Sequence, residues 1–111
     1  TPAPPSMGPS PPGACLVGVV TMETTIYANE VSWSIRVEGQ DSALCEGLQG
    51  QYANNAETPQ SCCLQAGTRY VLKCVDSYGD GWHGGYLEVG TTKYCKDNSQ
   101  WSVQQHIISL A

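Results

Sequence analysis

The feature that most constrains this chain of 111 residues is its set of six cysteines. Their number is even, and their spacing lacks the paired C-x-x-C arrangement that is typical of zinc sites. A domain of about a hundred residues is near the size at which covalent links help a small core. We therefore predict three disulfides and an oxidising, extracellular or cell-surface location. The cysteines are Cys15, Cys45, Cys62, Cys63, Cys74 and Cys95.

The pairing of these cysteines is open among fifteen arrangements. Cys62 and Cys63 are adjacent, and a disulfide between neighbours requires a strained peptide. We expect each of the two to bond to a different partner.

Charge and hydropathy exclude two classes of function. The formal net charge is −5, from five basic and ten acidic residues, whereas nucleic-acid binding requires a basic surface. The longest apolar run, residues 16–20, is far shorter than the roughly 20 residues that span a bilayer. We expect no nucleic-acid partner and no membrane span. The chain begins at Thr1, so we expect either a removed signal peptide or a fragment of a longer protein.

Short apolar or alternating runs separated by Gly, Asn, Asp and Ser fill residues 14–111, a pattern typical of strands joined by turns. The clearest predicted strand is 31–37, whose sequence VSWSIRV alternates apolar residues (Val, Trp, Ile) with polar ones (Ser, Arg). We predict further strands at 16–22, 69–75, 85–89 and 101–110, with a weaker one at 50–52. This pattern predicts an all-β fold, a disulfide-stapled antiparallel β-sandwich of the jelly-roll or immunoglobulin-like kind.

Two predicted strands are apolar on both faces. They are residues 16–20 and residues 106–110. One interpretation is a central strand that is covered on both sides within one domain; the other is that one face meets a neighbouring subunit or the N-terminal arm. Under the second interpretation, Leu16, Val17 and Val19 are interface residues.

The N-terminal arm, residues 1–13, reads TPAPPSMGPSPPG and holds six of the seven prolines. Proline fixes φ and removes a backbone donor, so we predict an extended polyproline II segment that docks on a partner. Its Ser-Pro-Pro and Pro-Pro-Ser runs resemble hydroxyproline-rich glycoproteins of algal and plant walls. No N-x-[ST] sequon occurs in the chain, so any sugar is expected to be O-linked. The candidates are Pro4, Pro5, Ser6, Ser10, Pro11 and Pro12 in the arm, with Thr24 and Thr25 beyond it.

A second resemblance covers most of residues 16–110. Residues 76–82 read D-S-Y-G-D-G-W, which resembles the signature of small β-rich modules in secreted and cell-surface proteins of algae, other protists and bacteria. Upstream, a Y-x-x-E-x-x-W segment runs from Tyr27 through Glu30 to Trp33, and a cysteine precedes a strand that carries a tyrosine, here Cys63 and Tyr70. The resemblance implies a β-sandwich in a surface or matrix protein.

The same signature loop is a candidate calcium site. Asp76 and Asp80 lie four residues apart among glycines, which let the backbone turn tightly. If Asp76 is position 1 of an EF-hand loop, then Asp80 at position 5, Gly81 at 6 and the Trp82 carbonyl at 7 fit the pattern. Tyr78 at position 3 and Leu87 at position 12 do not fit, because calcium ligands are expected there. The alternative is that both aspartates cap their own turn while the glycines take positive φ.

Aromatic side chains flank the loop. Trp82, His83 and Tyr86 could form a platform for a sugar ring, or Trp82 could be buried and hold the loop onto the sandwich. His83 and His106 are the only histidines, and no G-x-S-x-G, H-E-x-x-H or Gly-rich phosphate loop occurs. We therefore expect no enzymatic activity.

Together these features predict a structural subunit of an extracellular fibre or cell-surface appendage. The subunit is expected to assemble head-to-tail through its arm and to be O-glycosylated. The alternative is a calcium-dependent or carbohydrate-binding module of a larger secreted protein.

Overall fold

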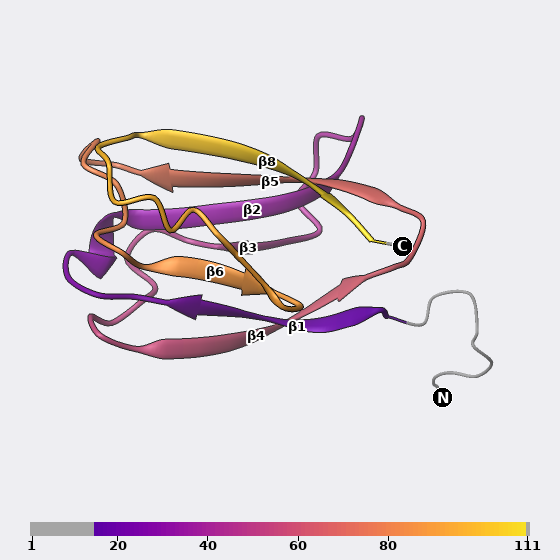
Figure 1. Cartoon of the computed structure of the whole chain (residues 1–111), viewed down its shortest axis with the longest axis horizontal. Coiled ribbons are helices and arrows are strands. Elements are labelled where there is room, and N and C mark those ends of the chain that lie inside the picture. The colour runs from indigo at the N-terminus through magenta and orange to yellow at the C-terminus, as the bar shows by residue number, and fades with distance from the viewer. Residues whose placement is uncertain (1–14, 111) are drawn as a thin grey trace.

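Antiparallel pairing of short strands builds two four-stranded sheets, as the computed structural model shows for residues 15–110 (Figure 1). One sheet has the order β4-β1-β6-β7 and the other the order β3-β2-β5-β8. A single turn of 3₁₀ helix, η1 (Ala28–Glu30), precedes β2. The all-β prediction is confirmed for the described residues. The strands are β1 (Val17–Glu23), β2 (Val31–Val37), β3 (Cys45–Gly47), β4 (Glu57–Leu64), β5 (Arg69–Asp76), β6 (Tyr86–Val89), β7 (Thr92–Tyr94) and β8 (Val103–Ser109).

Five of the predicted strands are present. β2 begins and ends at the predicted residues, and β1, β5, β6 and β8 lie within two residues of the predicted bounds. The strand predicted at 50–52 is wrong: a turn ends at Gly50, residues 51 and 52 are irregular, and the Tyr52 side chain is buried in the core. β3, β4 and β7 were not predicted.

One hydrophobic core lies between the two sheets. Alternation turns Val20 and Met22 of β1 inward, where they meet Trp33 and Ile35 of β2 and Leu72 of β5, all buried. The Trp33 indole donates a hydrogen bond of 2.9 Å to the Tyr52 hydroxyl, and that hydroxyl donates to Gln60. The expected core position of Trp33 is confirmed.

The three predicted disulfides are present, and no free cysteine remains among the described residues. Cys15 bonds to Cys63, Cys45 to Cys62, and Cys74 to Cys95. Cys62 and Cys63 thus have different partners, as expected. The second and third bonds each join the two sheets. Cys45 of β3 and Cys74 of β5 belong to one sheet, whereas Cys62 lies in β4 and Cys95 directly follows β7 in the other.

Most connections cross from one sheet to the other. The β1–β2 and β5–β6 connections both do so at the same end of the domain, opposite the end at which β1 starts and β8 finishes (Figure 1). The arm, residues 1–13, and its O-glycosylation candidates lie outside the described residues. Within residues 15–110, no helix is long and apolar enough to cross a membrane.

Peptide mapping under non-reducing conditions is expected to recover the three linked pairs above. Replacing Cys74 and Cys95 together by Ala is expected to lower the free energy of unfolding by about 2 to 5 kcal/mol, because the unfolded chain gains freedom. Denaturant titration measures the loss. A free thiol at any of the six positions, or a peptide that links Cys62 to Cys63, would contradict this pairing.

Candidate functional site

The β1–β2 and β5–β6 connections form the candidate site, and the register of two strands brings them together. In the β2–β5 ladder, Val31 lies opposite Asp76. Glu30, one residue before Val31, therefore lies beside the residues that follow β5. The Ser77 amide confirms this neighbourhood by donating a 3.0 Å hydrogen bond to the Glu30 carbonyl.

Asp76 is the last residue of β5, and the alternation of that strand directs its side chain into the core. Only 2% of its surface is exposed. One carboxylate oxygen, Oδ2, accepts a hydrogen bond of 2.6 Å from the Asp80 amide, and the other, Oδ1, has no hydrogen-bond partner. A buried carboxylate with a free oxygen is unfavourable unless something else neutralises it.

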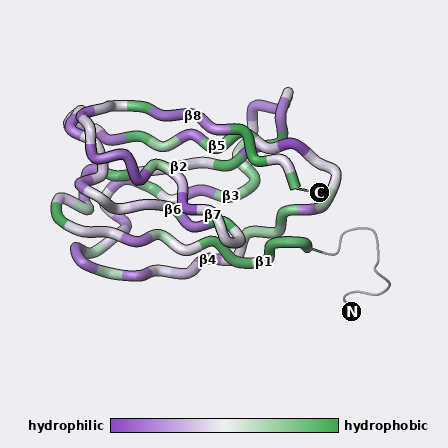
Figure 2. The backbone as a smooth tube through the Cα atoms, in the orientation of Figure 1, coloured by the Kyte–Doolittle hydropathy of each residue, from purple (hydrophilic) through white to green (hydrophobic). Residues whose placement is uncertain are grey.

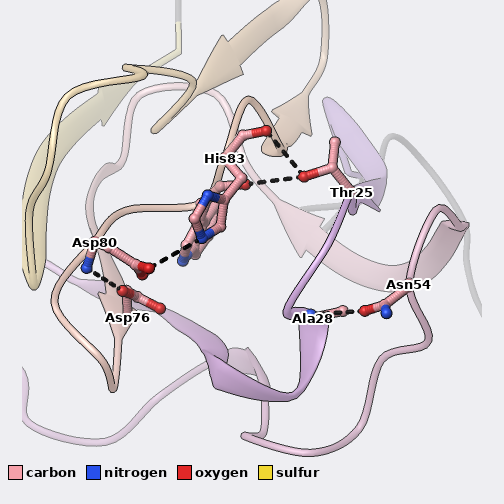
Figure 3. A network of polar contacts seen from close by, with 7 residues as sticks. Thr25, Ala28, Asn54, Asp76, Asp80 and His83 are labelled. Carbon is pink, nitrogen blue, oxygen red and sulfur yellow. Dashed lines mark hydrogen bonds and ion pairs between the residues drawn. The ribbon is translucent and has the colours of Figure 1, made fainter.

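Asp80 and His83 meet within the β5–β6 connection (Figure 3). The imidazole Nε2 lies 3.3 Å from the Asp80 Oδ2, which is an ion-pair distance. The contact does not have the geometry of a hydrogen bond, and both Nε2 and the Asp80 Oδ1 are buried atoms without a hydrogen-bond partner. The two side chains are about three-quarters buried.

Glu30 completes the cluster from the other connection. Its Oε1 is also buried without a hydrogen-bond partner. Ligand atoms of Glu30, Asp80 and His83 all lie within 4.8 Å of one another. The Asp76 carboxyl lies within hydrogen-bonding reach of the Glu30 and Asp80 carboxyls, but ionised carboxylates cannot donate to one another. We call Glu30, Asp76, Asp80 and His83 the acidic cluster.

Burial and mutual repulsion perturb two of these carboxyls. Desolvation raises the pKa of Glu30, and the charges of Asp76 and Asp80 raise it further, while His83 opposes the shift. Desolvation also raises the pKa of Asp76, together with the neighbouring Asp80 carboxyl, against hydrogen bonds from the Asp80 and Gly79 amides. Both groups thus disfavour the ionised state.

Side-chain hydrogen bonds hold the two connections in place (Figure 3). The Thr25 hydroxyl donates to the His83 carbonyl at 2.9 Å. The Asn54 side-chain oxygen accepts a 2.9 Å bond from the amide of Ala28, the first residue of η1. Thr24 is buried, and its hydroxyl donates to the Ala53 carbonyl at 2.6 Å. Both threonine hydroxyls are used within the fold, which argues against the O-linked sugars considered for them.

The backbone of the loop requires glycine where the sequence has it. Gly81 has φ of +80°, and a Cβ there would lie 2.6 Å from the Ser99 carbonyl oxygen, so no other residue fits. His83 itself has φ of +54°, which is uncommon for a residue with a side chain. Its ring stacks at a tilt on Tyr27, also left-handed, with 5.2 Å between ring centroids.

The sequence interpretation of the loop found two members of the cluster. The turn-capping alternative is present in part, because Asp76 accepts a bond from the Asp80 amide. The contiguous EF-hand count does not describe the loop: Tyr78 is 76% exposed, and Leu87 is fully buried in the core. Glu30 and His83 were not predicted as members, although the resemblance had already placed Glu30 in its Y-x-x-E-x-x-W segment.

The flanking aromatic residues do not form one platform. Trp82 is 1% exposed, and its indole donates a 3.0 Å hydrogen bond to the Val75 carbonyl, so it holds the loop onto the core. Trp101 packs against it with ring centroids 5.5 Å apart. Tyr86 instead lies beneath the ammonium groups of Lys93 and Lys96.

In comparisons with protein-family models, curated proteins and solved structures, nothing matched this chain.

With a chelator present, the free energy of unfolding is expected to fall as the pH rises above the ordinary carboxyl pKa values, which are 3.8 for Asp76 and 4.5 for Glu30. A carboxyl with a raised pKa in the folded state binds its proton more tightly there, so ionisation destabilises the fold. Asp76→Asn should flatten this slope. Chemical denaturation from pH 3.5 to 8 measures it, and a slope that is unchanged in the variant would contradict the assignment.

Proposed function

We propose that the chain is a structural subunit of an extracellular fibre or cell-surface appendage, assembled head-to-tail through its N-terminal arm and O-glycosylated on that arm. The observation that carries the proposal is a pair of exposed apolar surfaces at opposite ends of the domain. A head-to-tail contact joins two different surfaces, and it generates an open filament unless the rotation closes a ring.

The first surface lies where β1 starts. Leu16 is 56% exposed and Val19 53% exposed, while Val17 packs partly against the core. Figure 2 colours this stretch of β1 as hydrophobic. β1 is a central strand between β4 and β6, so its edges are paired, yet its outward apolar side chains remain uncovered by the described residues. This supports the interface interpretation of the doubly apolar segment.

The second surface lies on the connections at the opposite end. Ile26 and Tyr27 of the β1–β2 connection are about half exposed, and Tyr78 of the β5–β6 connection is 76% exposed. We call these three residues the tyrosine end. Aromatic surfaces bind polyproline II segments well, because such segments are already extended and lose little entropy on docking. The occupant that we propose is the arm of the next subunit.

The length of the arm agrees with this occupant. Thirteen residues of polyproline II span roughly 40 Å at about 3.1 Å per residue. A folded domain of a hundred residues has a radius of gyration of about 13 Å. The arm of one subunit is therefore long enough to reach across a neighbour.

The main competing function is a calcium-dependent or carbohydrate-binding module of a larger secreted protein. The acidic cluster favours a metal in particular, because three of its buried carboxylate oxygens lack hydrogen-bond partners. No such observation favours a sugar platform, since Trp82 is buried.

Deleting residues 1–13 is expected to abolish polymer formation and leave a folded monomer. The deleted segment precedes the first disulfide cysteine, so the fold should persist. Electron microscopy and size-exclusion chromatography measure assembly, and circular dichroism measures folding. A truncated chain that forms the same polymer would refute the arm-linked proposal and favour the binding module.

Tyr78→Ser is expected to reduce assembly at a given concentration at least about tenfold, since an aromatic contact of the tyrosine end is lost. Stability should change by no more than about 0.5 kcal/mol, because the side chain is exposed. Ile107→Ser is the matched control: it is 44% exposed on the outer face of the edge strand β8. The reverse result, with assembly lost only in the control, would place the contact at the sheet edge.

A further inference from the structure

Four buried polar atoms of the acidic cluster have no hydrogen-bond partner, one from each of its residues. Buried polar groups in folded proteins are almost always paired, so a cluster of this kind requires an explanation. These atoms come from two chain segments about fifty residues apart. The fold, and not a local turn, brings them together.

No lysine or arginine side chain within residues 15–110 neutralises the cluster. All five basic residues lie within residues 15–110, and none forms an ion pair with Glu30, Asp76 or Asp80. Arg69 pairs with Glu38, and the Arg36 guanidinium donates to the Gln40 carbonyl. The other three basic residues are lysines that lie elsewhere. Lys93 and Lys96 lie over the Tyr86 ring, and Lys73 is exposed on β5. Three carboxyls thus face one imidazole.

Asp76 is the independent sign of a ligand. The Asp76 side chain is more than nine-tenths buried, and its Oδ1 has no hydrogen-bond partner. The Asp76 carboxyl lies within hydrogen-bonding reach of the Glu30 and Asp80 carboxyls. A buried carboxylate that only capped its turn would need a single oxygen, the one that accepts from the Asp80 amide. The second oxygen, Oδ1, has no hydrogen-bond partner, and a bound cation would satisfy it.

The donor types select the class of cation. Calcium takes six to eight oxygen ligands, whereas imidazole nitrogen suits zinc and other first-row transition ions. Zinc commonly takes four ligands drawn from nitrogen and carboxylate oxygen. The cluster offers one nitrogen, from His83, and carboxylate oxygens from Glu30 and Asp80, with these ligand atoms within 4.8 Å of one another.

We infer that Glu30, Asp80 and His83 bind a single divalent transition ion of the zinc type, beside the buried Asp76 carboxyl. The ion would tie the β1–β2 connection to the β5–β6 connection. This inference is independent of the fibre proposal, and it assigns the metal of the competing function to the zinc class in place of calcium.

The test uses the full chain without a histidine tag, stripped with chelator and then titrated with ZnCl₂, MnCl₂ or CaCl₂ by calorimetry. We expect one zinc per chain, bound at least about tenfold more tightly than calcium, and a higher melting temperature with zinc. Because the described cysteines are all in disulfides, no thiol competes for the ion.

The variants separate the ligands from the scaffold. E30Q and H83N are each expected to weaken zinc binding at least about tenfold, since even residues that only support ligands have effects of that size. Asn tolerates the left-handed backbone of position 83, so H83N keeps the loop conformation. The matched controls are E88Q on β6 and H106Q on β8, which lie outside the cluster and should bind zinc as the unmodified chain does.

Several results would overturn the inference. One is the absence of zinc binding at millimolar concentration. Another is tighter binding of calcium with no effect of H83N, which would restore the calcium interpretation. The third is a proton shared between the Glu30 and Asp76 carboxyls at neutral pH, seen by carbon NMR and unchanged by zinc, which would explain the free oxygens without a metal.

Discussion

The pairing of β2 with β5 is the constraint on which the rest of this structure depends. Seven consecutive residue pairs join the two strands, from Val31 opposite Asp76 to Val37 opposite Tyr70. This register turns Trp33 and Leu72 into the same core, and a shift by one residue would turn the apolar set of β2 to solvent. It also fixes Glu30 beside the end of β5. The core and the acidic cluster therefore share one cause.

The adjacent cysteines show how strand geometry divides the covalent links. Successive side chains of a strand point to opposite faces, so neighbours in β4 cannot serve the same side of the sheet. Cys62 is buried and joins β3 across the core, whereas Cys63 is half-buried and joins Cys15 at the start of the chain. One link thus closes the two sheets on each other, and the other secures the point from which the arm extends. A small core gains most from links between layers that otherwise meet only through side chains.

The sequence predicted most of the fold because short apolar or alternating runs are separated by turn residues. β2 is the clearest case, with Val31, Trp33 and Ile35 inward and serines outward. β4 was missed because its inward positions include Thr58 and Gln60, and because it contains Pro59. The structure accounts for both: β4 is an edge strand, where proline is tolerated, and the Gln60 amide donates to the Glu46 carbonyl of β3 at 3.2 Å.

The acidic cluster was predicted only in half, for a different physical reason. Asp76 and Asp80 lie close in sequence, and local spacing reveals such pairs. Glu30 reaches them only through the register of β2 on β5, which no local pattern encodes. The sequence analysis placed His83 among the flanking aromatic residues and not in the cluster. Its left-handed backbone positions it in the cluster, and that conformation cannot be inferred from the neighbouring residues.

The proposed metal site and the proposed surface for the arm lie next to each other at the tyrosine end. The Tyr27 ring lies 5.2 Å from the His83 ring, and Tyr78 belongs to the connection that carries Asp76 and Asp80. An ion that joined the two connections would also fix the relative positions of these exposed tyrosines, so the surface that receives an arm would be ordered before docking. Preorganisation of that kind strengthens binding because less freedom is lost on association.

Neutralising part of the acidic cluster would also reduce repulsion between subunits that each carry a net charge of −5. A metal in this cluster would therefore favour assembly without touching the arm at all.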